Sequence, residues 1–156
     1  MGQGAELDEL ERSLALVLRG LTDRATVSDL AERSGHDLPP ASWALLEHLA
    51  ARGALRVSDI AACHGVDVSS VTPRLKRLET AGLVQRERAA SDGRAFLITI
   101  TAEGTRALES VHAARREILR DALSGVEPGR LAHTAAVLRR VADHLAREPA
   151  GTRHGP

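Results

Sequence analysis

The sequence predicts a mainly helical α+β protein that contains one short β-hairpin. Three observations predict this class. Aromatic residues are almost absent, with one Trp, one Phe and no Tyr, so the core must consist of Leu, Ala, Val and Ile, a bias that favours helices. Apolar residues recur at three- and four-residue steps along most of the chain. Only residues 83–101 instead show two runs rich in β-branched residues, separated by the hairpin turn signal Asp92-Gly93.

The first 37 residues predict two helices. Leucines at three- and four-residue steps fall on one helix face: Leu7, Leu10, Leu14, Leu18 and Leu21. Residues 22–26 interrupt this pattern. A second helical segment at 27–33 ends before Gly35, which we expect to be its C-cap.

A third helix is predicted to begin at Pro40. A proline suits the first turn because its missing N–H would have no helical partner there. Gly53 is expected to end this helix. Its predicted buried face consists of Trp43, Leu45, Leu46 and Leu49.

Two helices joined by a glycine turn follow. The first is short, with Ser58 as its expected N-cap and Ile60 and Ala61 on its apolar face. Gly65 provides the turn. The second helix runs over residues 68–81 and ends at Gly82; Asp67 or Ser69 can cap it, and its predicted buried face is Val71, Leu75 and Leu78.

The rest of the chain predicts two strands and two long helices. The strands are expected at 83–88 and 95–101, and Thr101 is the expected N-cap of the next helix. The last helix begins at Glu127-Pro128. The residues expected to form the apolar stripes of these two helices are Leu108, Val111, Ile118, Leu119, Ala122, Leu123, Leu131, Val137, Leu138, Val141 and Leu145. Residues 148–156 are expected to be a flexible tail.

Composition and charge restrict the function. The chain is 43% hydrophobic and 27% charged, which is typical of a globular protein. It has no apolar run near the roughly 18 residues of a membrane span and no evident signal peptide, so we expect a cytoplasmic protein without a membrane partner. The net charge is zero, yet residues 1–37 carry a net −4 and residues 68–94 a net +3. Such a basic segment is compatible with local nucleic-acid contact, and equally with a solvated helix face crossed by salt bridges.

The order helix, glycine turn, helix and β-hairpin is that of a winged helix-turn-helix. The second helix is long enough to lie in the major groove of DNA, and the hairpin forms the wing. The candidate DNA-binding residues are Ser69, Ser70, Thr72, Arg74, Arg77, Arg86, Arg88, Asp92 and Arg94. Each of them alone is explained equally well by helix capping or by a solvated charge, but their combination in this order is more specific.

Several segments resemble the MarR family of bacterial winged helix-turn-helix regulators. They are PASWALL at 40–46, VSDIA at 57–61, GVDVSSVT at 65–72, RLETAGLV at 77–84, SDGR at 91–94 and ITAEG at 100–104. The resemblance covers about residues 38–147. It implies dimerisation helices at 1–37 and 102–147 around a DNA-binding domain at 38–101.

The resemblance also implies a mode of action. A homodimer would read a pseudo-palindromic operator in double-stranded DNA, with half-sites about 10 bp apart. The helix at 68–81 would lie in the major groove, and Asp92 would orient Arg94 into the minor groove. Family members usually repress transcription, and many release DNA on binding a small phenolic or lipophilic effector. The chain departs from the family at Pro73, which either kinks this helix or starts a shortened one capped by Thr72.

The sequence gives weaker support for catalysis, metal binding, redox sensing or protein binding. No G-x-S-x-G, H-E-x-x-H, P-loop or G-x-G-x-x-G motif occurs, so we expect no enzymatic activity, no catalytic residues and no cofactor. The seven histidines show no metal-ligand spacing. Cys63 is expected to be a buried structural thiol, with a redox sensor as the alternative. A winged-helix module that contacts protein instead of DNA is the remaining alternative.

Overall fold

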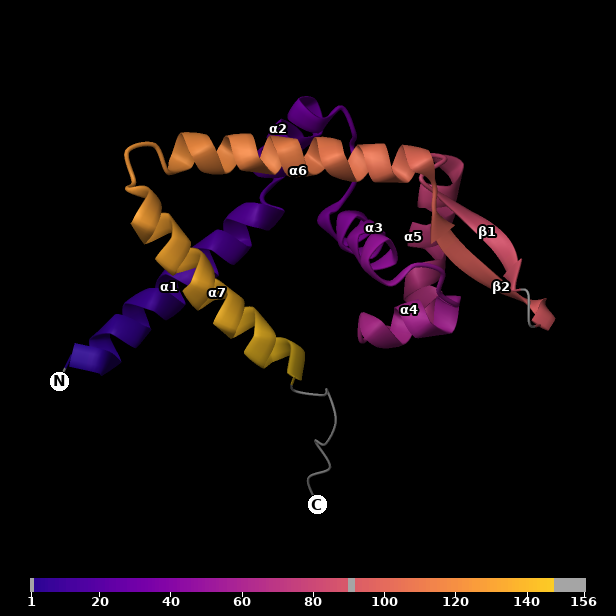
Figure 1. Ribbon diagram of the computed structural model, residues 1–156, viewed down its shortest axis with the longest axis horizontal. Coiled ribbons are helices and arrows are strands. Elements are labelled where there is room, and N and C mark those ends of the chain that lie inside the picture. The colour runs from indigo at the N-terminus through magenta and orange to yellow at the C-terminus, as the bar shows by residue number, and fades with distance from the viewer. Residues whose placement is uncertain (1, 90–91, 148–156) are drawn as a thin grey trace, which may run out of the picture. The chain divides into compact units, whose positions relative to one another are not determined.

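The computed structural model describes residues 2–89 and 92–147, and among these the side chains of 4–89 and 96–145. The described part is mainly helical with one antiparallel strand pair, so the predicted fold class is confirmed (Figure 1). The chain divides into two units, residues 1–116 and 117–156. The elements in chain order are α1 (Gly2–Thr22), α2 (Arg24–Ser34), α3 (Pro40–Arg52), α4 (Val57–Cys63), α5 (Val68–Thr80), β1 (Val84–Ala89), β2 (Asp92–Ile100), α6 (Ala102–Ala122) and α7 (Pro128–Arg147).

The predicted break between the first two helices lies at Asp23. Its carboxylate accepts a hydrogen bond from the Ala25 N–H at 3.0 Å and so caps α2. Gly35 ends α2 with a φ of 74°, a left-handed conformation that only glycine adopts without strain. Both predicted helices and the predicted C-cap are therefore confirmed.

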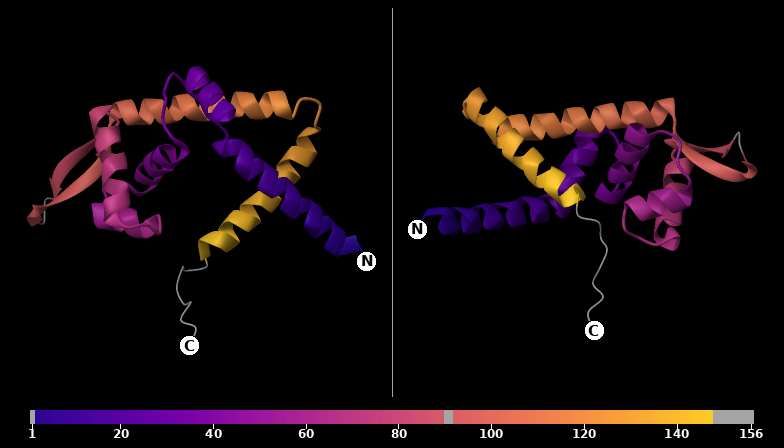
Figure 2. Two further views of the ribbon diagram at one scale, coloured as in Figure 1. Left: turned by 180° about the vertical axis from the view of Figure 1, so that it is seen from behind. Right: turned by 60° about the horizontal axis from the view of Figure 1, so that its bottom comes forward.

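The hydrophobic core lies among α3, α4, α5, the strands and the first part of α6. Every residue predicted on the buried faces of the three middle helices is at most 3% exposed: Trp43, Leu45, Leu46, Leu49, Ile60, Ala61, Val71, Leu75 and Leu78. The first part of α6 adds Ala107, Leu108 and Val111 to the same cluster. Figure 2 shows α6 extending from the sheet across α3. A polar contact also joins these two helices, because the Glu47 carboxylate accepts a hydrogen bond from Arg115 and lies 3.3 Å from the His112 Nε2.

A compact junction connects the end of α5, the start of β1 and the start of α6. The Thr101 hydroxyl donates to the Gly82 carbonyl oxygen at 2.6 Å and accepts from the Gly104 N–H at 3.0 Å. Thr101 therefore caps α6, as predicted. Its own N–H donates to the Leu83 carbonyl oxygen at 3.0 Å. Gly104 allows this approach, since a Cβ there would lie 2.1 Å from the same Leu83 oxygen.

The strand pair extends further than its turn signal predicts. The antiparallel register runs from Val84 opposite Ile100 to Arg88 opposite Phe96, and it shifts between Arg88 and Ala89. Asp92 pairs with Ala89, so Asp92 and Gly93 belong to β2. The prediction that they form the hairpin turn is wrong, because the irregular register continues the pairing past the glycine.

The start of α4 also differs from its prediction. Ser58 does not cap this helix; α4 begins at Val57, and its N-cap is Arg56, without a side-chain hydrogen bond. The Arg56 carbonyl oxygen accepts the N–H groups of Asp59 and Ile60, both at 3.0 Å, so the first turn closes before Ser58 can cap it. Asp67 is the N-cap of α5, one of the two predicted alternatives, and it too makes no side-chain cap bond.

Large apolar side chains stay exposed on α1 and on α7. On α1, Leu7, Leu18 and Leu21 are 57–65% exposed. On α7, Leu138 is 46% and Leu145 68% exposed. Apolar faces of this size on two long helices are typical of surfaces that another protein covers.

Within the described residues, every helix is too short or too polar to cross a lipid bilayer. The tail predicted at residues 148–156 lies outside the described residues.

Candidate nucleic-acid interface

Helices α4 and α5 form the predicted helix-turn-helix. Gly65 makes the turn with a φ of 61°, and the Val66 N–H bonds back to the Ala61 carbonyl oxygen at 3.1 Å. The Asp67 carbonyl oxygen then accepts the N–H groups of Ser70 and Val71 at 2.9 and 3.3 Å. These backbone bonds form the turn and the start of α5, where no side chain makes a cap hydrogen bond.

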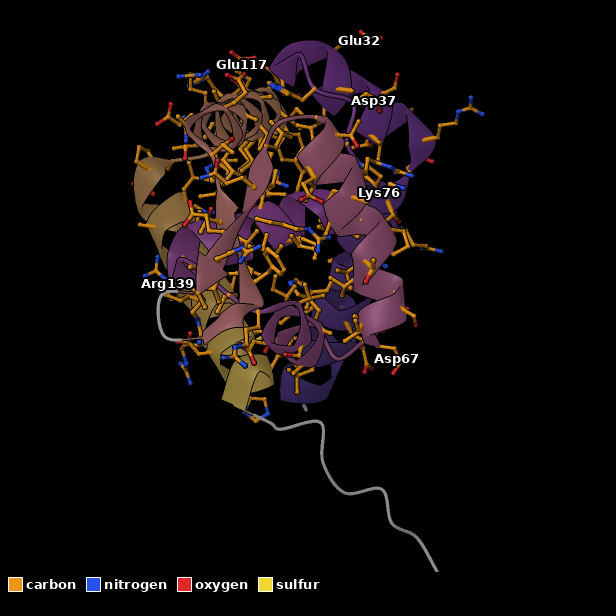
Figure 3. The ribbon with its side chains drawn as sticks, turned by 90° about the vertical axis from the view of Figure 1, so that its right-hand side faces the viewer. Glu32, Asp37, Asp67, Lys76, Glu117 and Arg139 are labelled. Atoms are coloured by element: carbon orange, nitrogen blue, oxygen red, sulfur yellow. The ribbon has the colours of Figure 1, made fainter. Side chains whose placement is uncertain are left out.

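Helix α5 has a buried face and a polar outer face. Val71, Leu75 and Leu78 are at most 1% exposed and pack into the core. The residues exposed on the rest of the helix are Val68, Ser69, Ser70, Thr72, Pro73, Lys76, Arg77 and Thr80. Figure 3 shows Lys76 on the outer side of α5, pointing away from the protein, and Asp67 at the N-terminal end of the helix. Hydroxyl groups thus dominate the first turn and positive charges the third.

Pro73 lies inside α5 and does not start it. The helix is continuous from Val68, so the alternative in which Thr72 caps a shortened helix is wrong. The Thr72 hydroxyl instead donates to the Val68 carbonyl oxygen at 2.8 Å, one turn back along the helix. A hydroxyl bonded in this way shares the carbonyl oxygen with the helical N–H and often bends a helix slightly.

Arg74 lies on the flank of α5 and is half-buried. It is close enough to His64, at the end of α4, to affect the titration of that ring. Burial lowers the pKa of His64 below its ordinary value of 6.5, and the nearby His48 and Arg74 lower it further. The His48 and His64 rings meet edge to face with their centroids 5.2 Å apart, and the Nε2 atom of each is buried without a hydrogen-bond partner. The His64 ring is therefore favoured in the neutral form.

The arginines of β1 make contacts within the protein. The Arg86 Nε donates to the Glu79 carboxylate at 2.9 Å and so ties β1 to the last turn of α5. The Arg88 guanidinium lies 5.8 Å from the centroid of the Phe96 ring. Both side chains are exposed and can still approach DNA. Asp92 and Arg94 lie in β2, and their side chains are outside the described residues.

The structure therefore brings Ser69, Ser70 and Arg77 together on one exposed surface, while Arg74 turns toward the helix-turn-helix itself. Lys76 is a candidate that the sequence did not single out. Its position five residues after the buried Val71 places it on the outer face, which the helical period alone could have indicated. We call the set Ser69, Ser70, Lys76 and Arg77 the α5 polar face.

Cys63 is exposed, so its prediction as a buried thiol is wrong. It is the last residue of α4, where the short helix buries only Ile60 and Ala61. In the described part of the chain, no cluster of three or more His, Cys, Asp or Glu side chains is arranged to hold a metal ion.

Known proteins are similar to this chain in sequence and in architecture. Residues 36–95 match the model of the MarR family. The HTH-type transcriptional repressor MdtR of Bacillus subtilis is 31% identical over 139 residues, which cover 87% of this chain and 90% of that protein. The crystal structure of the YusO protein from Bacillus subtilis is similar with a TM-score of 0.68 and 26% identity, over 92% of this chain and 99% of that one.

A MarR family protein from Bacillus stearothermophilus has the same fold, with a TM-score of 0.77 at 20% identity, over 94% of this chain and 100% of that one. The matched segment includes the helix-turn-helix and most of the wing, and the match to MdtR extends over both terminal regions. The chain belongs to the MarR family of winged helix-turn-helix transcriptional regulators.

Proposed function

We propose that this regulator is a homodimeric repressor that binds a pseudo-palindromic operator in double-stranded DNA and acts in the cytoplasm by binding rather than by catalysis. The observation that carries the proposal is the α5 polar face. It presents hydroxyl groups and two cations on the exposed side of a helix whose other side is anchored in the core. A helix of 13 residues with this surface has the length and chemistry to enter a major groove.

The proposed contacts divide between phosphates and bases. Ser69 and Ser70, in the first turn of α5, suit phosphate contacts or approach to base edges. Arg77 is a long donor able to bind guanine through two hydrogen bonds. Arg94, on the wing, is proposed to enter the adjacent minor groove, oriented by Asp92.

The proposed dimer is formed by the segments 1–37 and 102–147, which flank the DNA-binding domain at 38–101. Its support is the row of exposed leucines on α1 and α7. Sedimentation velocity should give twice the 16.6 kDa of one chain. Leu138→Glu should shift this equilibrium toward the monomer, whereas Arg139→Glu, about 100° away around α7 and outside the row of leucines, should leave it unchanged. A monomer for the parent protein would refute the dimer.

DNA binding is tested with fragments of the DNA that neighbours the gene, in gel-shift assays over a range of salt. We expect the affinity to fall steeply as salt rises, because cations on the protein replace counterions on the phosphates. Arg77→Ala and Arg94→Ala should each weaken binding about 10-fold or more and leave the dimer intact. Arg116→Ala, an exposed arginine on α6, is the matched control and should bind as the parent does. Salt-independent binding or no binding would favour the module that contacts protein.

Effector release is the part of the proposal that rests on family membership. A small lipophilic or phenolic molecule would bind the conformation that cannot bind DNA more tightly than the conformation that can. The ratio of these two affinities limits how far the molecule can reduce the affinity for the operator. Because Trp43 and Phe96 are the only aromatic residues, its site would be mostly aliphatic. Titrating salicylate and longer aryl acids into the operator complex tests this, and an unchanged affinity would argue against such effectors.

A second candidate is regulation by oxidation at Cys63, which the exposure of this thiol favours. Peroxide should then release the parent protein from DNA and have no effect on Cys63→Ser. Equal responses of the two proteins would exclude this candidate.

A further inference from the structure

Pro73 occupies the middle of the outer face of α5. At about 100° per residue, it lies almost directly opposite the mean direction of the buried Val71, Leu75 and Leu78. Ser69 precedes it by one turn on the same side, and the exposed Lys76 follows it by almost one turn. A helix that lies in a groove with its buried face toward the protein presents this line of residues to the base edges.

The chemistry of Pro73 differs from that of its neighbours on this line. A proline has no N–H, so within α5 it offers only the methylene groups of an exposed ring. The adjacent Thr72 has its hydroxyl hydrogen bonded to the Val68 carbonyl oxygen at 2.8 Å. Neither residue has a hydrogen left to donate to a base. The centre of the outer face is therefore apolar, between hydroxyl groups on one side and cations on the other.

The fold itself gains little from this proline. Its ring is exposed instead of packed in the core, and proline has the highest propensity cost of any residue inside a helix. A contact made by the ring outside the chain would offset that cost. In the major groove, the apolar group that distinguishes one base from the other three is the C5-methyl of thymine.

We propose that Pro73 is a specificity-determining residue that contacts the C5-methyl group of one thymine in each operator half-site. This inference rests on the proposed function of the chain as a DNA-binding dimer. The flanking Ser69 and Arg77 supply the hydrogen bonds, and Pro73 selects thymine at the position between their contacts. A polar side chain at position 73 would instead accept or donate hydrogen bonds and would not favour thymine.

The test begins with the parent protein and a pool of random duplexes, from which the bound sequences are selected. Each thymine of the selected operator is then replaced singly by deoxyuridine, which removes the methyl group and leaves the hydrogen-bonding edge unchanged. A methyl group withdrawn from water contributes roughly 0.8 kcal/mol, which corresponds to about a fourfold change in affinity. We expect such a loss at one thymine per half-site, and about 15-fold when both are replaced together.

Variants of Pro73 then identify the contact. Pro73→Val keeps an apolar side chain and should keep the preference for thymine over deoxyuridine. Pro73→Ala, whose single methyl group reaches less far, should weaken that preference, and Pro73→Asn should reduce it to about one. All three restore a backbone N–H to α5, so they differ in the side chain rather than in the helix, and Trp43 fluorescence verifies that the core is intact. Thr80→Ala, on the same face in the last turn, should retain the parent's preference.

Each result has a definite meaning. An operator whose thymines can all be replaced without loss would overturn the inference and leave the proposed function standing. Equal loss of the thymine preference in Pro73→Val and Pro73→Asn would also overturn it, because the proline would then act through the backbone. If the chain selects no duplex at all, the proposed function fails and this inference fails with it.

Discussion

Replacing Gly104 with alanine should destabilise the winged helix-turn-helix domain, although alanine is the better helix former. A Cβ at this position would lie 2.1 Å from the Leu83 carbonyl oxygen, 2.7 Å from the Ile100 Cγ1 and 3.0 Å from the Leu83 carbonyl carbon. Two of these three atoms belong to the backbone, so no rotamer change relieves the contact. The start of α6 must move by about 1.3 Å to bring the 2.1 Å contact to the 3.4 Å of an ordinary van der Waals contact.

The magnitude follows from what that movement disturbs. Overpacking of this kind costs about 1–3 kcal/mol. The displacement also strains the two hydrogen bonds of Thr101 to Gly82 and Leu83, at 2.6 and 3.0 Å, each of which contributes about 0.5–1.5 kcal/mol. The gain in helix propensity offsets at most about 1 kcal/mol of this. We expect a net loss of about 2–4 kcal/mol, a large part of the stability of a typical domain.

Urea unfolding at a fixed protein concentration measures this loss, because the proposed dimerisation would make the apparent stability depend on concentration. The fluorescence of Trp43, which is 1% exposed, reports on the core, and circular dichroism reports on the helices. Gly129→Ala is the matched control in the first turn of α7. Its new Cβ would meet only the flexible Glu127 side chain, at 3.0 Å, so we expect unchanged or slightly greater stability. An unchanged midpoint for Gly104→Ala would show that α6 is not seated against Leu83.

Two further predictions concern charge. Burial, His48 and Arg74 lower the pKa of His64 in the folded state, so the unfolded chain takes up a proton at a higher pH than the folded chain does. The contribution of His64 to the free energy of unfolding should therefore be complete above its ordinary pKa of 6.5. It should decrease as the pH falls from there toward the lowered pKa of the folded state. Urea titrations from pH 7.5 to 5 should show this slope, and His64→Asn should flatten it; an unchanged slope would assign it to another group. Glu47→Gln should lower the free energy of unfolding by no more than about 1 kcal/mol, because the Glu47 and Arg115 side chains are 39% and 38% exposed. This loss should become smaller in 1 M NaCl. A salt-independent loss above about 2 kcal/mol would contradict the prediction.

The helices of the domain were predictable because their signals are local. The spacing of Val71, Leu75 and Leu78 determines which side of α5 is buried, and it also places Lys76 and Arg77 outside. The helical period determines which residues share a face, whatever the helix packs against. The α5 polar face could therefore be read from the sequence, apart from the role of Lys76.

The features that could not be predicted depend on how the segments pack and pair. Cys63 is exposed because the helix that carries it is short and its last turn does not face the core, which no property of a cysteine reveals. The pairing of Arg86 with Glu79 crosses the turn after α5 and needs the register of β1 to be known. Strand β2 likewise begins at Asp92, before Gly93, since Ala89 of β1 pairs with Asp92. In each case the outcome depends on packing or strand pairing, which local propensity does not determine.

The continuity of α5 through Pro73 shows how two opposing local signals are decided. The proline removes the single helical bond that would end on the Ser69 carbonyl oxygen. Starting the helix at residue 73 would avoid this cost but would expose Val71, whose burial contributes about 1.5–3 kcal/mol, and would break the bonds that the Asp67 carbonyl oxygen accepts. The longer helix is therefore favoured. As a consequence Ser69 and Arg77 lie on one rigid element, roughly 12 Å apart along its axis, a span that matches about three to four base-pair steps of DNA.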